Sequence, residues 1–219
     1  MTILGIIFDL DGTLLNTLDD ISDAMNYALS KCGFNPYSID QYRYFVGSGV
    51  DILVKRALQK YDYTQEDFDN VKNAYLEQYQ KVQDHKTRPY PGILELIDIL
   101  YRQNIKLAIL SNKPHQDTIN VVTKYFDINK FNIVLGQRKG IAIKPSPQSV
   151  YEILGHFNLD KDNVLYVGDT DIDMQTARNA GLTSVGVTWG FRTYEELLKN
   201  NANFIINNPL DLVQIINQK

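Results

Sequence analysis

Short apolar runs recur along the chain, and segments with helical periodicity separate them. The first run covers Ile3–Phe8, and five later runs resemble it: Ile105–Leu110, Asn132–Leu135, Val164–Val167, Ser184–Val187 and Phe204–Ile206. Short continuous apolar runs of this kind indicate buried strands. Strands that alternate with helices predict an α/β fold with a doubly wound parallel, Rossmann-like sheet, whose ligand crevice lies at the carboxyl ends of the strands.

Residues 16–85 interrupt this alternation, because their apolar positions repeat with helical spacing only. The helical stripes cover Leu18–Leu29, Val50–Leu58 and Phe68–Tyr79, and we expect no strand in this segment. We therefore predict an all-helical cap domain over residues 16–85, inserted into an α/β catalytic core of residues 1–15 plus 86–219. Two prolines and a glycine in residues 89–92 are typical of a stiff hinge followed by a helix.

Two aspartates follow the first apolar run. Asp9 and Asp11 are two positions apart, and side chains with this spacing on a strand share a face, so both carboxylates point to the same place. Like charges this close need a cation between them, a shared proton or different roles. A simple turn after the strand would account for Gly12 and for one of the two aspartates, but poorly for both.

Three further polar motifs follow later apolar runs. Ser111 and Asn112 come before a predicted helix, Lys144 comes before a proline, and Gly168 opens a segment with three carboxylates. A hydroxyl and free amides at a helix start form an anion site, although such residues are also ordinary helix caps. Taken alone, Lys144 fits a solvated surface charge equally well, and one of the three carboxylates, Asp171, fits a helix cap.

These four motifs, in this order, resemble those of the haloacid dehalogenase superfamily of phosphohydrolases. The family pattern is Asp-x-Asp-Gly-Thr, then a strand-end Ser, then a Lys, then Gly-Asp-x-x-x-Asp, and the resemblance extends over the whole chain. The position of the insert is similar to that of the subclass with a helical cap. Segments Val46–Gly49 and Gly186–Gly190 look most like phosphoglycolate phosphatases and their pyrophosphatase relatives.

The resemblance implies a Mg²⁺-dependent phosphatase that works through an aspartyl-phosphate. Asp9 would be the nucleophile, Asp11 would protonate the leaving oxygen and later activate water, and Lys144 would bridge Asp9 and the phosphate. An aspartate at position 11 also implies a phosphate enzyme, because dehalogenases of this superfamily lack it. Thr13 would orient the nucleophile loop or stabilise the turn.

The resemblance also implies which residues hold the metal and the phosphate. The implied Mg²⁺ ligands are Asp9, the backbone carbonyl of Asp11, Asp169 and Asp173, the last directly or through water. The implied phosphate-binding groups are the Ser111 hydroxyl, Lys144 and the backbone amides around Leu10, Asp11 and Asn112. In the cap, amides near Gly47 and Ser48 would face a carboxylate or a distal phosphate of the substrate, or form an ordinary glycine-rich turn.

The resemblance favours a small anionic phosphate monoester such as 2-phosphoglycolate as the substrate. Three alternatives stay open. Inorganic pyrophosphate would fit the same chemistry, and a sugar-phosphate mutase similar to β-phosphoglucomutase would use the same aspartyl-phosphate. The third alternative is a non-catalytic binding module on this fold.

Composition narrows the setting and the partners. The 219 residues are 44% apolar and 22% charged, which is ordinary for a globular enzyme. The net charge is −4 and the basic residues are scattered, so we expect no nucleic-acid or membrane partner. The partner that the resemblance implies is a small-molecule phosphate. The single cysteine, Cys32, and the absence of a signal-peptide pattern favour a cytoplasmic protein, as a monomer or a homodimer.

Overall fold

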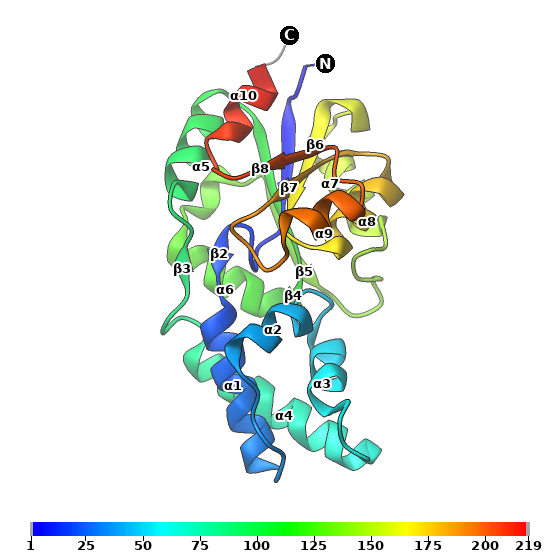
Figure 1. Cartoon of the computed structure of the whole chain (residues 1–219). Helices are drawn as coiled ribbons and strands as arrows, with labels where there is room; N and C mark the ends of the chain where they lie inside the picture. Colours follow the sequence, from blue (N-terminus) through cyan, green and yellow to red (C-terminus); the bar gives the residue numbers. More distant parts are fainter. Residues whose placement is uncertain (1, 218–219) are drawn as a thin grey trace.

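The computed structural model describes residues 2–217 and has a parallel sheet of six strands above a group of helices (Figure 1). The strands lie in the order β5-β4-β1-β6-β7-β8, and each pairs in parallel with its neighbours. Their bounds are β1 Gly5–Phe8, β4 Lys106–Pro114, β5 Ile133–Gln137, β6 Val164–Gly168, β7 Thr183–Val187 and β8 Phe204–Ile206. The predicted α/β fold is confirmed.

The topology places the crevice at the end of β1. Phe8 at the end of β1 is aligned with Ile109 of β4 on one side and with Val167 of β6 on the other. The chain passes from β1 to β4 and later returns to β6, so the strand order reverses at β1. In doubly wound sheets a ligand crevice opens where the order reverses, at the carboxyl ends of the strands. The polar motifs lie at the ends of β1, β4 and β6 and on the segment after β5, at this edge.

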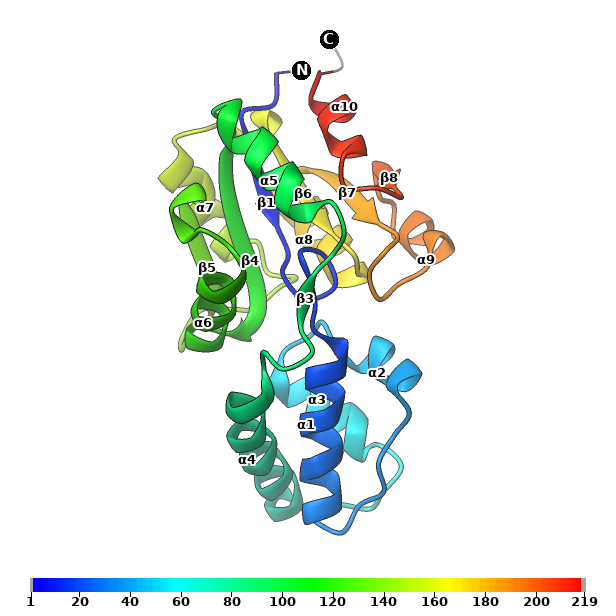
Figure 2. The same ribbon diagram turned by 90° about the vertical axis from the view of Figure 1, so that its left-hand side faces the viewer.

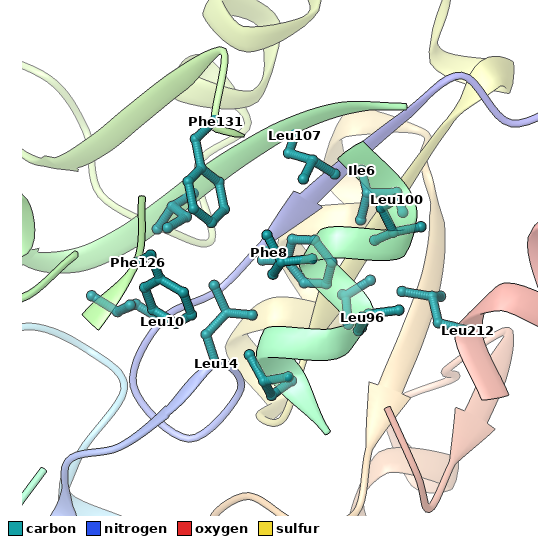
Figure 3. Close-up of a cluster of buried hydrophobic side chains, with 14 of the residues drawn as sticks. Ile6, Phe8, Leu10, Leu14, Leu96, Leu100, Leu107, Phe126, Phe131 and Leu212 are labelled. Carbon is teal, nitrogen blue, oxygen red and sulfur yellow. The ribbon is translucent and has the colours of Figure 1, made fainter. Parts of the chain in front are cut away.

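Helices cover both faces of the sheet. The helices beside and between the strands are α5 Ile93–Arg102, α6 His115–Tyr125, η1 Ile128–Lys130, α7 Gln148–Phe157, η2 Lys161–Asn163, α8 Asp171–Ala180, α9 Tyr194–Lys199 and α10 Asp211–Asn217. Side chains of β1 alternate between the faces, because Ile6 and Phe8 join a cluster with α5, α6 and α10, whereas Ile7 joins one with α7 and α8. Figure 3 shows the first of these clusters, with Leu96 and Leu100 beside Phe8.

Four helices lie beyond the carboxyl ends of the strands and have their own cluster of buried side chains (Figure 2). These cap helices are α1 Leu18–Lys31, α2 Ile39–Phe45, α3 Val50–Leu58 and α4 Gln65–Val82. The three predicted stripes correspond to α1, α3 and α4. The sequence pattern did not indicate α2, because seven residues are too few for a clear periodicity. The division into a cap of residues 16–85 and a core of 1–15 plus 86–219 stays a prediction.

A two-stranded ribbon joins the cap helices to the sheet. Strand β2 Leu15–Asn16 pairs antiparallel with β3 Arg88–Pro89, so the expectation that residues 16–85 contain no strand is wrong at its first residue. A strand of two residues is too short to show an alternating pattern. The buried carboxylate of Asp20 also accepts hydrogen bonds from the backbone N–H of Lys86 at 2.9 Å and of Thr87 at 2.8 Å. The two chain segments that connect the sheet with the cap helices are therefore joined by hydrogen bonds.

Strand β4 is longer than its apolar run. It continues through Ser111–Lys113 to Pro114, with a register irregularity opposite β5, and α6 begins at His115. Pro114 is the residue at the N-cap of α6, so Ser111 and Asn112 do not cap that helix. Of the helices within residues 2–217, none combines the length and the apolar composition needed to cross a membrane.

Candidate active site

Three buried carboxylates converge beyond the ends of β1 and β6. Asp9 follows β1, Asp169 follows β6, and Asp173 lies in the first turn of α8; one oxygen of each lies within 4.8 Å of the others. The Asp9 N–H donates to the Val167 carbonyl at 2.9 Å, which holds the two strand ends together. Gly168 lets Asp173 lie close to the end of β6, since an added Cβ would lie 2.3 Å from the Cβ of Asp173.

Lys144 supplies positive charge to this cluster. Its buried Nζ lies 2.8 Å from an oxygen of Asp9 and 2.7 Å from an oxygen of Asp173. Burial opposes the charged form of this lysine, but Asp173 and Asp9 outweigh that effect and raise the pKa of Lys144 well above its usual range. The side chain of Asn112 holds the lysine loop, because it accepts from the Lys144 N–H at 2.9 Å and donates to its carbonyl at 3.1 Å.

One lysine does not balance three carboxylates. Burial, followed by the charge of Asp173, raises the pKa of Asp9 well above its usual range and the pKa of Asp169 to about 7. Asp169 is nevertheless held in place, since it accepts from the Thr13 hydroxyl at 2.9 Å and from the Phe191 N–H at 2.8 Å. A buried, oxygen-only cluster with excess negative charge fits a hard divalent cation.

The carboxylate of Asp173 is already bonded through both oxygens. One oxygen accepts from Lys144, and the other accepts from the Thr170 N–H at 3.0 Å and from its hydroxyl at 2.6 Å. Asp169 is also bonded through both oxygens, but by fewer donors of residues 2–217: one oxygen accepts from the Thr13 hydroxyl and the other from the Phe191 N–H, and neither donor is charged. Asp173 thus combines a place among the converging acids with the task of holding Lys144.

Among the described residues the acid cluster does not include Asp11, whose side chain forms an ion pair with a second lysine. Lys113 Nζ lies 3.1 Å from an oxygen of Asp11, and it donates to the hydroxyl of Tyr79 at 2.8 Å. Lys113 is part of β4, whereas Tyr79 belongs to cap helix α4, so the lysine joins both parts of the protein. The Lys113 N–H donates to the hydroxyl of Ser111 at 3.1 Å, which connects it with the predicted phosphate-binding serine.

A cavity of about 40 Å³ lies between the cap helices and the sheet. Residues that line it include Asp9, Asp11, Ser111 and Lys113 from the core and Gly47 and Tyr79 from the cap. An ordered water needs at least roughly 10–15 Å³, so the cavity has room for a few waters or for a small solute. Asp9 is therefore reached through a small space between the cap helices and the sheet.

The profile of the haloacid dehalogenase-like hydrolases matches residues 6–187. The chain belongs to this family. It is a phosphatase of the family, in accordance with the predicted enzyme class. The four motifs that carried the predicted resemblance all lie within the matched range.

The most similar relatives support this assignment over nearly the whole length. A phosphoglycolate phosphatase of Mannheimia succiniciproducens is 31% identical over 95% of this chain and 96% of its own. One of Aquifex aeolicus is 31% identical over 96% and 95%. A crystal structure from Haemophilus somnus, of a predicted phosphoglycolate phosphatase, has a TM-score of 0.92 at 28% identity and covers 98% of both chains.

Most of the predicted site residues lie either in the acid cluster or on the adjoining cavity. Asp9, Asp169, Asp173 and Lys144 are in direct or near contact, and Asp11 and Ser111 line the adjoining cavity. The remaining predicted residues act differently. Leu10 is buried in the sheet cluster and can offer only its backbone (Figure 3), and Thr13 bonds Asp169.

The two predicted cap residues also differ from each other. Gly47 lines the cavity, and its carbonyl accepts from the side chain of Asn112 at 3.1 Å. Ser48 is not among the residues that line the cavity, so its predicted contact with a substrate stays a prediction without support from this geometry.

Several residues of the site were not singled out from the sequence. Lys113 directly follows Ser111 and Asn112, and this position was the one available signal. Arg192 lies on the loop after β7, and its guanidinium donates to backbone carbonyls of Arg43 and Val46 in the cap. Nothing in the spacing of these residues indicates such contacts, because they join segments far apart in the chain.

Proposed function

We propose that this phosphatase hydrolyses a small anionic phosphate monoester of the 2-phosphoglycolate type. The observation that carries the proposal is that Asp9, held by Lys144, and Asp11, held by Lys113, line one small cavity. The names of the similar proteins from Mannheimia succiniciproducens and Aquifex aeolicus support the same substrate. A cavity of this size favours a substrate of a few heavy atoms over a nucleotide or a hexose bisphosphate.

In the proposed reaction, a carboxylate oxygen of Asp9 attacks phosphorus and the bond to the ester oxygen breaks. Asp11 gives its proton to the departing oxygen, so the alcohol leaves neutral. Asp11 then takes a proton from water, whose oxygen attacks the phosphorus of the aspartyl-phosphate and restores Asp9 with release of phosphate. Lys144 keeps its charge throughout and offsets the approach of two anions.

We propose Mg²⁺ as the cofactor, bound by Asp9, Asp169, the backbone carbonyl of Asp11 and Asp173. The excess negative charge of the cluster supports a divalent cation here. Because one oxygen of Asp173 accepts from the charged Lys144 and the other accepts from two donors of Thr170, we assign this residue a contact through water and the positioning of Lys144. Bound Mg²⁺ would offset the charge of the acids and of the phosphate.

Phosphate release tests the proposal. The native chain, with and without Mg²⁺, would be compared on 2-phosphoglycolate, pyrophosphate and β-glucose 1-phosphate, the last with and without its bisphosphate. We expect Mg²⁺-dependent turnover that is fastest on 2-phosphoglycolate and is lost in Asp9→Asn. Asp162→Asn, which changes an exposed aspartate far along the chain, is the control.

Each of the other outcomes would either replace one part of the proposed function or contradict the proposed nucleophile. Faster release from pyrophosphate would replace the proposed substrate. Isomerisation of glucose 1-phosphate that depends on the bisphosphate would replace hydrolysis by transfer. Release that is equally fast in Asp9→Asn would contradict the proposed nucleophile.

A further inference from the structure

Lys113 is the one cationic residue among the described residues that line the cavity. The other lining groups are carboxylates, such as Asp11 and Asp117, the neutral amide of Asn112, two glycines, and apolar or hydroxyl-bearing side chains, such as Leu53 and Tyr75. A substrate with a second anionic group brings that charge into this enclosed space. Burial of an unpaired carboxylate is strongly unfavourable, so the charge needs a cationic partner there.

The contacts of Lys113 leave it able to bind such a group. Its ammonium has three donors. Among the described residues, it forms an ion pair with Asp11 at 3.1 Å and donates to the hydroxyl of Tyr79 at 2.8 Å. No other acceptor within residues 2–217 bonds this nitrogen. The side chain is buried, so water does not compete freely for the remaining donor.

The position of Lys113 fits the shape of the proposed substrate. Its backbone N–H bonds the hydroxyl of Ser111, and its ammonium contacts Asp11, the proposed proton donor to the ester oxygen. In 2-phosphoglycolate one methylene group separates the ester oxygen from the carboxylate. When the ester oxygen of the substrate lies at Asp11, its carboxylate lies one methylene group away. The carboxylate is therefore also close to the ammonium of Lys113, because that ammonium contacts Asp11.

We propose that Lys113, oriented by Tyr79 of the cap, receives the second anionic group of the substrate and thereby selects carboxylate-bearing phosphate esters. This assignment rests on the proposed function and adds the residue that recognises the substrate. Tyr79 stacks on Tyr75 with ring centroids 5.5 Å apart, so its hydroxyl is held at a fixed place on α4. Recognition thus requires the cap helices to lie over the sheet as in Figure 2.

The sharpest test compares two substrates that differ only in whether a carboxylate or a methyl group follows the methylene group. Ethyl phosphate resembles 2-phosphoglycolate but has a methyl group in place of the carboxylate, and both have poor leaving groups. The ratio of kcat/KM for 2-phosphoglycolate to kcat/KM for ethyl phosphate would be measured with Mg²⁺ for the native chain, Lys113→Met, Lys113→Gln and Tyr79→Phe. Lys55→Met, which removes an exposed lysine of the cap, is the control.

We expect the native chain and Lys55→Met to share a high ratio. The ratio should fall by about 10-fold to 100-fold in Lys113→Met and Lys113→Gln, because a charge-assisted hydrogen bond is lost. It should fall by a smaller factor in Tyr79→Phe, which keeps the ammonium but loses the hydroxyl. Pyrophosphate, measured in parallel, shows whether a second phosphate is received in the same way.

Other results would overturn the inference in distinguishable ways. If Lys113→Met slows both esters equally, Lys113 only positions Asp11, and the proposed function stands without this inference. The same holds if both Lys113 variants keep the native ratio. If the native chain itself shows no preference for 2-phosphoglycolate, the proposed substrate fails and the inference fails with it. Lys113→Gln, similar in length, serves if Lys113→Met does not fold.

Discussion

The buried surroundings of Asp169 disfavour the charged form of its carboxylate. Its pKa is raised from 3.8 to about 7, chiefly by burial and then by Asp173. An acid whose pKa rises on folding stabilises the folded state while it is protonated. That contribution is complete below the unfolded-state pKa and is lost as the pH rises through about 7.

The first prediction is that protein stripped of divalent cations loses stability as the pH increases. Between about pH 5 and about pH 8 we expect the free energy of unfolding to fall by about 2–4 kcal/mol, measured by urea denaturation with a chelator present. Asp169→Asn should show a smaller dependence on pH. Stability that stays level or increases over this interval in the native chain would contradict the assigned shift.

Asp11 gives the second prediction at the residue scale. If it protonates the leaving oxygen, Asp11→Asn should lower kcat for alkyl phosphates by about 10²-fold to 10⁴-fold. p-Nitrophenyl phosphate should lose much less, because its leaving group departs without a proton. Steady-state kinetics on both substrates measure the difference, and equal losses would assign Asp11 a different role.

The sequence indicates single residues well where a motif is local, and poorly where the partner is distant. Asp9 and Asp11 stand out because two carboxylates follow one apolar strand. Lys113 does not stand out, since its partner Tyr79 is 34 positions earlier and on another element. No local spacing encodes that contact, because the packing of α4 against the end of β4 creates it.

At the scale of elements, β2 and β3 with Asp20 form the joint between the sheet and the cap helices. The buried Asp20 carboxylate accepts from two backbone N–H groups, and also from the Thr87 hydroxyl at 2.7 Å. We predict that Asp20→Ala lowers the free energy of unfolding by about 2–4 kcal/mol, because these donors lose their acceptor in a buried place.

A neighbouring aspartate offers the matched control for this joint. Asp23 pairs with Lys86 at 2.6 Å, but both side chains are about half exposed. An exposed ion pair contributes about 0–1 kcal/mol, so Asp23→Ala should have a small effect in the same denaturation experiment. Equal losses in the two variants would show that the joint is not held by Asp20.

The strands of the main sheet were predictable because burial on both faces gives continuous apolar runs, and each of its six strands overlaps a predicted run. The end of β4 was not predictable, because the strand continues through the polar residues Ser111–Lys113 and its register with β5 shifts there. Elements of few residues, such as α2 and β2, escape detection because periodicity needs several turns or alternations. The fold class was therefore predictable, and the elements that were missed were those that are short or polar.

At the scale of the whole molecule, contacts between the loop after β7 and the cap helices hold the two parts together. Arg192 donates to two backbone carbonyls of the cap, and Arg43 donates back to the Gly190 carbonyl at 3.2 Å. The Trp189 indole N–H donates to the Thr13 carbonyl at 2.9 Å, so the same loop also contacts the segment after β1. The loop after β7 thus connects the cap with the nucleophile segment.

We predict that Arg192→Ala loosens this arrangement. KM for 2-phosphoglycolate should rise by about 3-fold to 10-fold, since hydrogen bonds that favour the closed cap are lost. Arg102→Ala on the exposed surface of α5 is the control and should keep the native KM. An unchanged KM in Arg192→Ala would show that the loop does not govern the position of the cap.

The central claim is that an oxygen of Asp9 accepts the phosphoryl group. The most direct measurement is a crystal structure of the native chain with Mg²⁺ and beryllium fluoride, which mimics a phosphoryl group on a carboxylate. We predict a beryllium trifluoride bonded to the Asp9 carboxylate, beside Lys144 and the Ser111 hydroxyl. Beryllium fluoride bound to another residue, together with native rates of hydrolysis in Asp9→Asn, would contradict the account.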